Sequence, residues 1–224
     1  MTLSIEFLSS DFCIVDKPAE MLSVPSRLGS KDPRPILGHL LEQQLGQKIW
    51  PCHRLDEDVS GLLLFALNAK AHRAANSWFE KHQIQKQYQA LSEHNHTSPR
   101  LNDPQLWACR LVRGKKRAYE ADFGKESKTN AKFLGSYSTD SQIQCFLWLL
   151  EPLTGRSHQL RYEMMRHLMP IVGDTLYGSQ IAFDEPGIAL RAVRLNFSAC
   201  TDLLEYALPQ ALALNKSRLF SSEF

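Results

Sequence analysis

Hydrophobic residues recur along this chain at two spacings, one typical of strands and one of helices. Apolar stretches at residues 5–8 and 12–15 flank Ser-Ser-Asp at 9–11 and predict two short strands around a turn, the second ending before Pro18. The run Leu-Leu-Leu-Phe-Ala at 62–66 predicts a buried strand, as does Cys-Phe-Leu-Trp-Leu-Leu at 145–150. The alternating residues 83–91 predict a half-exposed strand.

Three helices are predicted between these strands. Apolar residues at helical spacing indicate one over 36–45 with Gly46 as its stop, another over 69–82, and a third from Ser157 to Leu168. In the third, Ser157 is suited to cap the exposed amides, and Leu160, Met164 and Leu168 are expected on the buried face. Strands and helices do not alternate regularly and no repeat is present, so we expect a single α+β domain over residues 1–224 rather than a doubly wound fold.

Composition narrows the class of protein. The chain has 224 residues, 43% of them hydrophobic, which suits a globular core and makes disorder a poor reading. No apolar run reaches the ~18–20 residues of a membrane helix, and the first residues do not resemble a secretory signal, so a cytoplasmic protein without a membrane partner is expected. Five scattered cysteines support neither a disulfide framework nor a Cys-x-x-Cys site, and most are expected to be buried.

The net charge is only +2, but the positive charge is concentrated in one segment. Between Arg110 and Lys132 there are eight basic residues (Arg110, Arg113, Lys115, Lys116, Arg117, Lys125, Lys128, Lys132) against three acidic ones (Glu120, Asp122, Glu126). Such a run is often just a solvated face, and contact with a nucleic acid is the functional alternative.

A cluster of charged residues precedes the strand at 62–66. His53, Arg54, Asp56, Glu57 and Asp58 lie within six positions, and placing them at a strand end costs desolvation unless the charges are paired or used. A loop with a local ion pair is the bland interpretation. A Cys52–His53 nucleophile pair is disfavoured because neighbours in an extended chain point apart, and an Asp56–Asp58 glycosidase pair is too closely spaced.

Two further groups could carry chemistry. Residues 154–161, Thr-Gly-Arg-Ser-His-Gln-Leu-Arg, lie at the predicted strand-to-helix junction, where His158 and Arg161 are helix neighbours and packing can hold the Arg161 guanidinium. The alternative without function is that His158 is a core residue whose hydrogen bonds are all made and Arg161 is a surface charge. In the strand at 83–91, Lys86 and Tyr88 share one face, although a sheet tyrosine is more often a core residue.

Taken in order, these motifs resemble the RluA-type pseudouridine synthase family. The resemblance rests on His-Arg-Leu-Asp at 53–56, Ser-Gly-Leu-Leu-Leu at 60–64, Lys-x-Tyr at 86–88, residues 155–161, and Pro-Ile-Val-Gly-Asp-Thr-Leu-Tyr-Gly at 170–178. Upstream it includes Val-Asp-Lys-Pro at 15–18 and Leu-Ser-Val-Pro at 22–25, so it covers about residues 12–195. It implies the family's α+β fold, with a mixed, largely antiparallel sheet, flanking helices, a central basic cleft and no separate N-terminal RNA-binding module.

The resemblance also implies roles for individual residues. Asp56 corresponds to the essential aspartate, Arg161 to the arginine that pairs with it, and Tyr88 to the aromatic residue that packs on the target base. Arg54 corresponds to an arginine that holds the RNA once the uridine has left its stack, and Leu190 to an apolar residue of the pocket. Lys86 and the basic residues Arg113, Lys115, Lys116 and Arg117 are expected to contact RNA. Val59 and Arg191 depart from the family pattern, which bears on loop geometry and RNA contacts near the pocket.

The implied reaction converts specific uridines of structured tRNA or rRNA to pseudouridine, without cofactor or metal, after the base is flipped out of its stack. A flipped base would cover Asp56 and disfavour its ionised form, so a bidentate Arg161 partner is expected. The rival interpretations are a catalytically silent RNA-binding or RNA-folding module on the same scaffold and a hydrolase using residues 56–58. The sequence specifies neither the RNA nor the oligomeric state.

Overall fold

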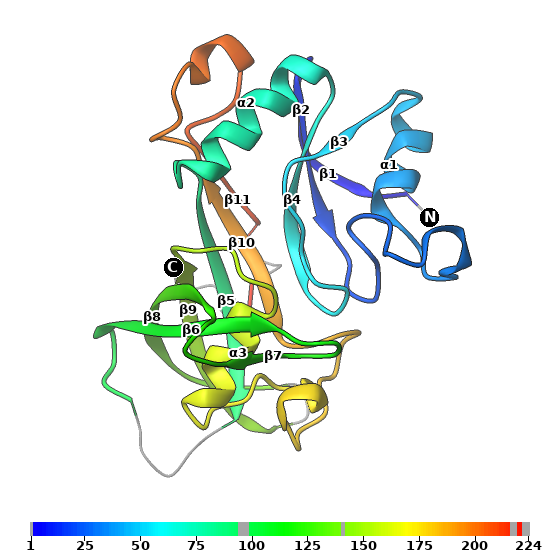
Figure 1. Cartoon of the computed structure of the whole chain (residues 1–224). Coiled ribbons are helices and arrows are strands. Elements are labelled where there is room, and N and C mark those ends of the chain that lie inside the picture. Colours follow the sequence, from blue (N-terminus) through cyan, green and yellow to red (C-terminus); the bar gives the residue numbers. More distant parts are fainter. Residues whose placement is uncertain (1, 94–98, 140–141, 216–218, 221–224) are drawn as a thin grey trace. The chain divides into compact units, whose positions relative to one another are not determined.

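The computed structural model describes residues 2–93, 99–139, 142–215 and 219–220. Their elements are shown in Figure 1. The helices are α1 (Leu37–Leu45), α2 (Ala69–Glu80) and α3 (Gln159–Arg166), with short 3-10 turns η1 (Gly29–Lys31), η2 (Thr175–Tyr177) and η3 (Leu203–Tyr206). The strands are β1 (Ser4–Leu8), β2 (Phe12–Lys17), β3 (Trp50–Pro51), β4 (Ser60–Ala66), β5 (Gln85–Glu93), β6 (Pro104–Arg113), β7 (Ala118–Glu120), β8 (Lys125–Ser138), β9 (Gln144–Pro152), β10 (Leu190–Asn196) and β11 (Ala211–Ala213).

The residues group into two compact units. The first comprises Met1–Gln85 and Ala192–Leu214, and the second Lys86–Arg191 and Asn215–Phe224. Every strand pair with a defined register is antiparallel, so the predicted α+β class and antiparallel pairing are confirmed. No helix in the described part of the chain is long and apolar enough to cross a membrane.

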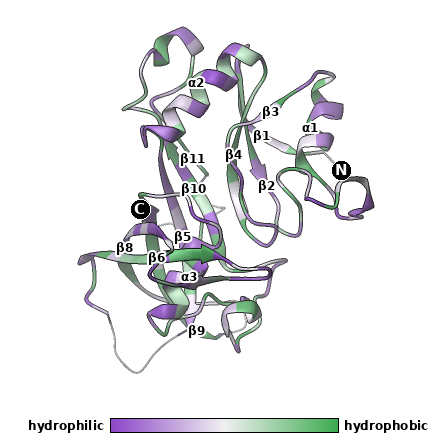
Figure 2. Cartoon of the chain, in the orientation of Figure 1, coloured by the Kyte–Doolittle hydropathy of each residue, from purple (hydrophilic) through white to green (hydrophobic). Residues whose placement is uncertain are grey.

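The first unit is built on strands β1, β2 and β4. β2 and β4 are almost entirely buried, which explains why both read as continuous apolar runs. Helix α2 covers them with Ala71, Ala75 and Trp78, and Figure 2 shows hydrophilic residues elsewhere along it. The Trp78 ring packs against Phe12 of β2 at 5.7 Å and meets Tyr206 of η3 edge-on at 5.4 Å. This core supports the loop before β4.

Gly61, the second residue of β4, lies where only a glycine fits. Its φ is 112°, and a Cβ there would lie 2.5 Å from the Ala192 backbone nitrogen of β10, within the same unit. A side chain is therefore excluded by both conformation and space. Gly46, with φ 67°, ends α1 as predicted.

The second unit is an antiparallel sheet with strand order β5-β9-β8-β6-β7. Its core contains Trp107, Phe133 and Trp148. The Trp148 ring lies 5.3 Å from that of Trp107 and 5.5 Å from that of Phe133. The basic segment is part of this sheet. Trp107, Cys109 and Leu111 alternate inward along β6 while Leu106, Ala108 and Arg110 are exposed, so the Arg110 charge lies on an exposed strand face. The predicted loop at 94–104 is described only from residue 99, and β6 begins at Pro104.

Helix α3 differs from the prediction at both ends. It starts at Gln159 with His158 at the N-cap in the left-handed region, and no side chain caps it, so the prediction for Ser157 is wrong. The helix ends at Arg166, and Leu168, beyond the end with φ 60°, is 78% exposed, so its predicted place on the buried face is wrong too. Leu160 and Met164 are buried as predicted.

Candidate active site

Asp56 lies in the loop between β3 and β4 of the first unit, and is half-buried. The residue before it is held by Ser23. The Ser23 hydroxyl donates to the Leu55 carbonyl at 2.8 Å and accepts from the Leu55 amide at 3.0 Å. Ser23 is itself buried, and its two bonds satisfy both backbone groups of Leu55. The backbone of Leu55, directly before Asp56, is therefore fixed by Ser23.

The residue after Asp56 is held by Lys17. The Lys17 ammonium donates to the carbonyls of Pro18, Met21 and Glu57 at 2.8, 2.7 and 3.1 Å. Its side chain is fully buried, and burial lowers its pKa to about 8, against the opposing attraction of the nearby carboxylates, Asp56 first. A lysine can serve here because its three N–H groups meet three backbone oxygens. Lys17 thus ties the end of β2 to the loop that carries Asp56.

An ion-pair network holds the Glu57 side chain. Arg34 binds Glu57 through Nη1 and Asp32 through Nε at 2.8 Å. Asp32 also accepts from the Ser26 hydroxyl, and these bonds, that of Arg34 first, lower its pKa well below the usual range. Glu57 of the charged cluster is therefore held by Arg34, which lies 23 positions away. This contact differs from the ion pair within the loop itself that the alternative interpretation expected. The two carboxylates of this Arg34 network are those of Asp32 and Glu57.

Cys52 and His53 take part in packing and backbone hydrogen bonding near the start of the Asp56 loop. The buried Cys52 thiol has its pKa raised to about 12 by burial, which removes it as a nucleophile. His53 Nε2 accepts from the Leu64 amide of β4 at 3.1 Å, and its ring lies 4.9 Å from that of Phe79. The expectation that these two residues are not a nucleophile–base pair is confirmed. Between them and Asp56, Arg54 is exposed to solvent.

In the second unit, Lys86 and Tyr88 lie in β5 as predicted. Tyr88 is 8% exposed and pairs with Leu150 of β9. Lys86 is half-buried, and burial lowers its pKa. Its Nζ lies 4.0 Å from the place that a Cβ on Gly155 would occupy. The strand therefore brings Lys86 beside the Gly-Arg-Ser-His loop, and Gly155 leaves room for the ammonium.

Arg161 is buried in α3 and is not the surface charge of the alternative interpretation. Its Nε and Nη2 donate to the two oxygens of Asp174, each at 2.7 Å, and the two side chains are 4% and 0% exposed. Such a planar two-point pair holds a guanidinium in one orientation. Asp174 takes two of the five N–H donors that a guanidinium carries, so this contact is compatible with Arg161 also binding a second carboxylate.

Tyr177 completes the surroundings of Arg161. Its ring lies 5.3 Å from the Arg161 guanidinium carbon, and its hydroxyl accepts from the Ala118 amide at 2.7 Å and lies 3.1 Å from His158 Nδ1. Tyr177 is 2% exposed. One aromatic residue therefore joins α3, η2 and β7 around the guanidinium.

The loop before α3 is held by Gln159. This buried side chain accepts from Thr154 and from the Arg156 amide, and its Nε2 donates to the Lys128 carbonyl of β8 at 2.9 Å. The bond to the Arg156 amide fixes the segment before the helix and is not a helix cap. The Gly-Arg-Ser segment is thus attached to β8.

The remaining predicted residues lie in β10 and in the β6–β7 hairpin. Leu190 is 3% exposed at the start of β10. Arg113, Lys115, Lys116 and Arg117 are all exposed at the hairpin end, where the Gly114 amide donates to the Arg117 carbonyl at 3.0 Å. Four cations on one short hairpin form a surface suited to phosphates.

The structure thus separates the predicted residues into two groups. Asp56 and Arg54 belong to the first unit, whereas Lys86, Tyr88, Arg161 and Leu190 belong to the second. Sequence reasoning missed four residues that hold these groups: Ser23, Lys17, Asp174 and Tyr177. All four lie within the quoted motifs, and the signal was a polar residue inside an otherwise apolar segment, such as Asp174 in Pro-Ile-Val-Gly-Asp.

Comparison with known proteins bears directly on this site. A family model described as RNA pseudouridylate synthase matches residues 11–167, which include the Asp56 loop, β5 and α3. The chain belongs to the RNA pseudouridylate synthase family. It is therefore an isomerase acting on RNA, as the motifs implied. The family resemblance inferred from the sequence is confirmed.

Curated relatives agree over most of the chain. An uncharacterized RNA pseudouridine synthase of Haemophilus influenzae is 33% identical over 180 residues, covering 80% of this chain and 75% of the relative. A tRNA pseudouridine synthase C of Vibrio parahaemolyticus is 32% identical over 210 residues, covering 87% and 84%. Among solved structures, human RNA Pseudouridylate Synthase Domain Containing 1 has 28% identity and a TM-score of 0.72, covering 90% of this chain and 80% of that one.

Proposed function

We propose that this enzyme isomerises uridines in structured RNA, with tRNA as the first candidate, through Asp56 as the indispensable group. The observation that carries the proposal is the way the chain holds Asp56: Ser23 binds the backbone before it and Lys17 the backbone after it. A carboxylate held at both flanks is preorganised for attack or proton removal, because little ordering remains to be done when the substrate arrives.

Arg161 is proposed to stabilise ionised Asp56 once the base excludes water. Its guanidinium is always protonated, and Asp174 and Tyr177 hold it in one orientation. This arrangement favours arginine over lysine, since a single ammonium could not engage two carboxylates in fixed planar geometry. The pairing of Asp56 with Arg161 stays a prediction, and the rigid support of each partner is what favours it.

The target base is proposed to stack on Tyr88, with Leu190 as an apolar contact. A uridine reaches such a site only after it leaves its stack, at a cost of a few kcal/mol. Exposed Arg54 is proposed to brace the RNA at the vacated position, and Lys86 to contact it near Gly155. Stacking on an aromatic face recovers ~1–3 kcal/mol per base and so offsets much of the flipping cost.

The isomerisation balances without any other reactant. The bond between C1′ and N1 of the uracil breaks, the base rotates, and a bond between C1′ and C5 forms. The hydrogen on C5 is released to solvent while N1 gains a proton. Asp56 would act either as a nucleophile or as the base that removes a ribose proton, and both roles need it ionised.

Phosphate contacts are proposed for the exposed cations of the β6–β7 hairpin, Arg113, Lys115, Lys116 and Arg117. Binding of this kind supplies affinity without reading sequence and weakens as salt rises. Three of the curated relatives at 31–34% identity, from Haemophilus ducreyi, Vibrio parahaemolyticus and Pasteurella multocida, are named tRNA pseudouridine synthase C. That name supports tRNA over rRNA as the substrate, and it fits the expected cytoplasmic location.

Nucleoside analysis after incubation with unmodified RNA tests the substrate. The purified enzyme is given unmodified tRNA and unmodified rRNA in separate reactions, and pseudouridine is separated from uridine by chromatography. We expect pseudouridine in the tRNA reaction. Pseudouridine in rRNA alone would overturn the tRNA assignment, and RNA binding without pseudouridine in either pool would favour the silent RNA-binding module.

A further inference from the structure

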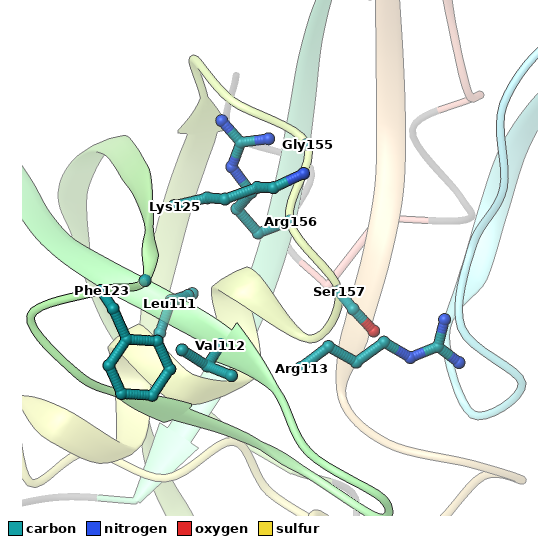
Figure 3. Close-up of a pocket in the computed structure, with 9 residues that line it drawn as sticks. Leu111, Val112, Arg113, Phe123, Lys125, Gly155, Arg156 and Ser157 are labelled. Carbon is teal, nitrogen blue, oxygen red and sulfur yellow. The ribbon is translucent and has the colours of Figure 1, made fainter.

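The sheet of the second unit also carries a pocket beside its exposed Phe123. A pocket of about 390 Å³ lies between the turn that joins β7 to β8, strand β6 and the Gly-Arg-Ser segment. Its lining is shown in Figure 3. The apolar side chains are grouped around the Phe123 ring, while Lys125 and Arg156 extend away from it. None of the nine lining residues is acidic.

Phe123 is presented to solvent by a tight turn. Its side chain is 78% exposed, whereas the other phenylalanine side chains in the described residues are buried or half-buried. The Ala121 amide donates to the Arg110 carbonyl at 3.1 Å, and the Gly124 amide to the Ala121 carbonyl at 2.8 Å. A Cβ on Gly124 would lie 2.7 Å from the Arg110 backbone, so the turn is pressed against β6. The ring is therefore held outward by the backbone.

One of the pocket's cations, Arg156, is held in place as well. Arg156 Nε donates to the Glu126 carbonyl of β8 at 2.8 Å, and its amide is bound by Gln159. The Glu126 carboxylate is paired with Lys128 at 2.7 Å, and this partner lowers the pKa of Glu126. The negative charge next to Lys125 in the sequence is thus already balanced, which leaves the pocket positive.

We propose that this pocket binds an unpaired nucleotide of the RNA substrate, with the base stacked on Phe123 and its phosphates on Lys125 and Arg156. An exposed aromatic face beside cations is the combination that holds single-stranded nucleic acid, because every base has a face for stacking. The volume lies within the range of small-ligand pockets. The inference rests on the proposed RNA-isomerase function but concerns a site separate from Asp56, Tyr88 and Arg161.

Binding measurements in the Asp56→Asn background test the site without turnover. The probes are an RNA stem-loop with an unpaired loop and a fully paired RNA duplex of equal length. Phe123→Ala is expected to weaken stem-loop binding at least about fivefold and to leave duplex binding unchanged. Phe123→Tyr should bind like the parent. Leu106→Ala, which removes an exposed side chain of β6 outside the pocket, is the matched control and should have no effect.

Salt dependence separates stacking from charge. Lys125→Gln should reduce the slope of log affinity against log salt by about 0.7, the value for one phosphate contact on a single strand, whereas Phe123→Ala should leave the slope unchanged. Stem-loop affinity of Phe123→Ala equal to that of Leu106→Ala would overturn the proposal. Equal weakening on the duplex and the stem-loop would overturn it too, since duplex bases are not available to stack.

Photo-cross-linking gives a readout on the chain with Phe123 intact. A stem-loop carrying 5-iodouridine in its loop should cross-link to Phe123, and cross-links confined to other residues would contradict the site.

The outcomes also separate this site from the proposed function. Normal pseudouridine formation with no effect of Phe123→Ala rejects only the pocket. A Phe123-dependent affinity in a chain that forms no pseudouridine rejects the function and retains the pocket.

Discussion

Replacing Asp174 by asparagine tests whether Arg161 is held by a buried carboxylate. The two side chains are 4% and 0% exposed and share two 2.7 Å bonds, so Asp174→Asn removes the negative charge that these two bonds bring to the buried guanidinium. Removing one partner of a buried pair costs about 3–5 kcal/mol in the free energy of unfolding. For a chain of 224 residues each kcal/mol lowers Tm by about 2–4 °C, so we expect a fall of about 6–20 °C.

Calorimetric thermal unfolding provides the assay, and the chain offers a matched control. The Lys70–Glu205 pair has a similar bond, at 3.1 Å, but its side chains are 65% and 58% exposed. Glu205→Gln should therefore change Tm by less than about 2 °C.

A double variant isolates the pair itself. Arg161→Met combined with Asp174→Leu removes both charges of this pair, so it should be more stable than Asp174→Asn alone, because neither member of the pair then remains without the other. Unfolding of Asp174→Asn within about 2 °C of the parent, like Glu205→Gln, would show that the guanidinium does not depend on Asp174.

Three further predictions follow from the Asp56 loop and the basic hairpin. Ser23→Ala removes both bonds to Leu55, so unfolding should cost about 1–3 kcal/mol less in urea titrations and kcat should fall at least about tenfold with little change in KM. Burial lowers the pKa of Lys17 to about 8, so between pH 8 and 10.5 the unfolded chain binds more protons than the folded one. Over that range the free energy of unfolding of the parent should rise by about 3 kcal/mol relative to that of Lys17→Met. No such rise would contradict the burial of the ammonium. Lys115→Gln with Lys116→Gln should reduce the salt slope of RNA binding by about 1.4, and an unchanged slope would remove the hairpin from the phosphate contacts.

Much of the fold was predictable because its apolar periodicity is strong. The strands β1, β2, β4, β5 and β9 and the helices α1 and α2 lie close to their predicted bounds. Strands β6 and β8 escaped notice because neither alternates cleanly between apolar and polar residues. Leu106 and Ala108 are exposed on β6, and Ser127 and Thr129 are buried on β8. Leu168 was misplaced because the helical spacing continues past Arg166, while the backbone turns to a positive φ there.

The candidate site was less accessible to sequence reasoning. Arg161 could be placed on a helix near its N-terminus from pattern, but its partner Asp174 lies 13 positions away with no periodic relation to it. Ser23 and Leu55 are 32 positions apart, and Lys17 and Glu57 are 40 apart. Contacts of this separation depend on the packing of the whole unit, which no local window contains. The four supporting residues therefore became evident only in the structure.

Release of tritium from RNA labelled at C5 of uridine tests most directly whether Asp56 carries the reaction, because forming the new bond at C5 displaces the label. The parent enzyme is compared with Asp56→Asn and with Asp58→Asn, a matched change two residues away in the same loop, while RNA binding is measured in parallel. We expect release from tRNA by the parent and by Asp58→Asn, and none by Asp56→Asn, which should still bind. Near-normal release by Asp56→Asn would contradict the account.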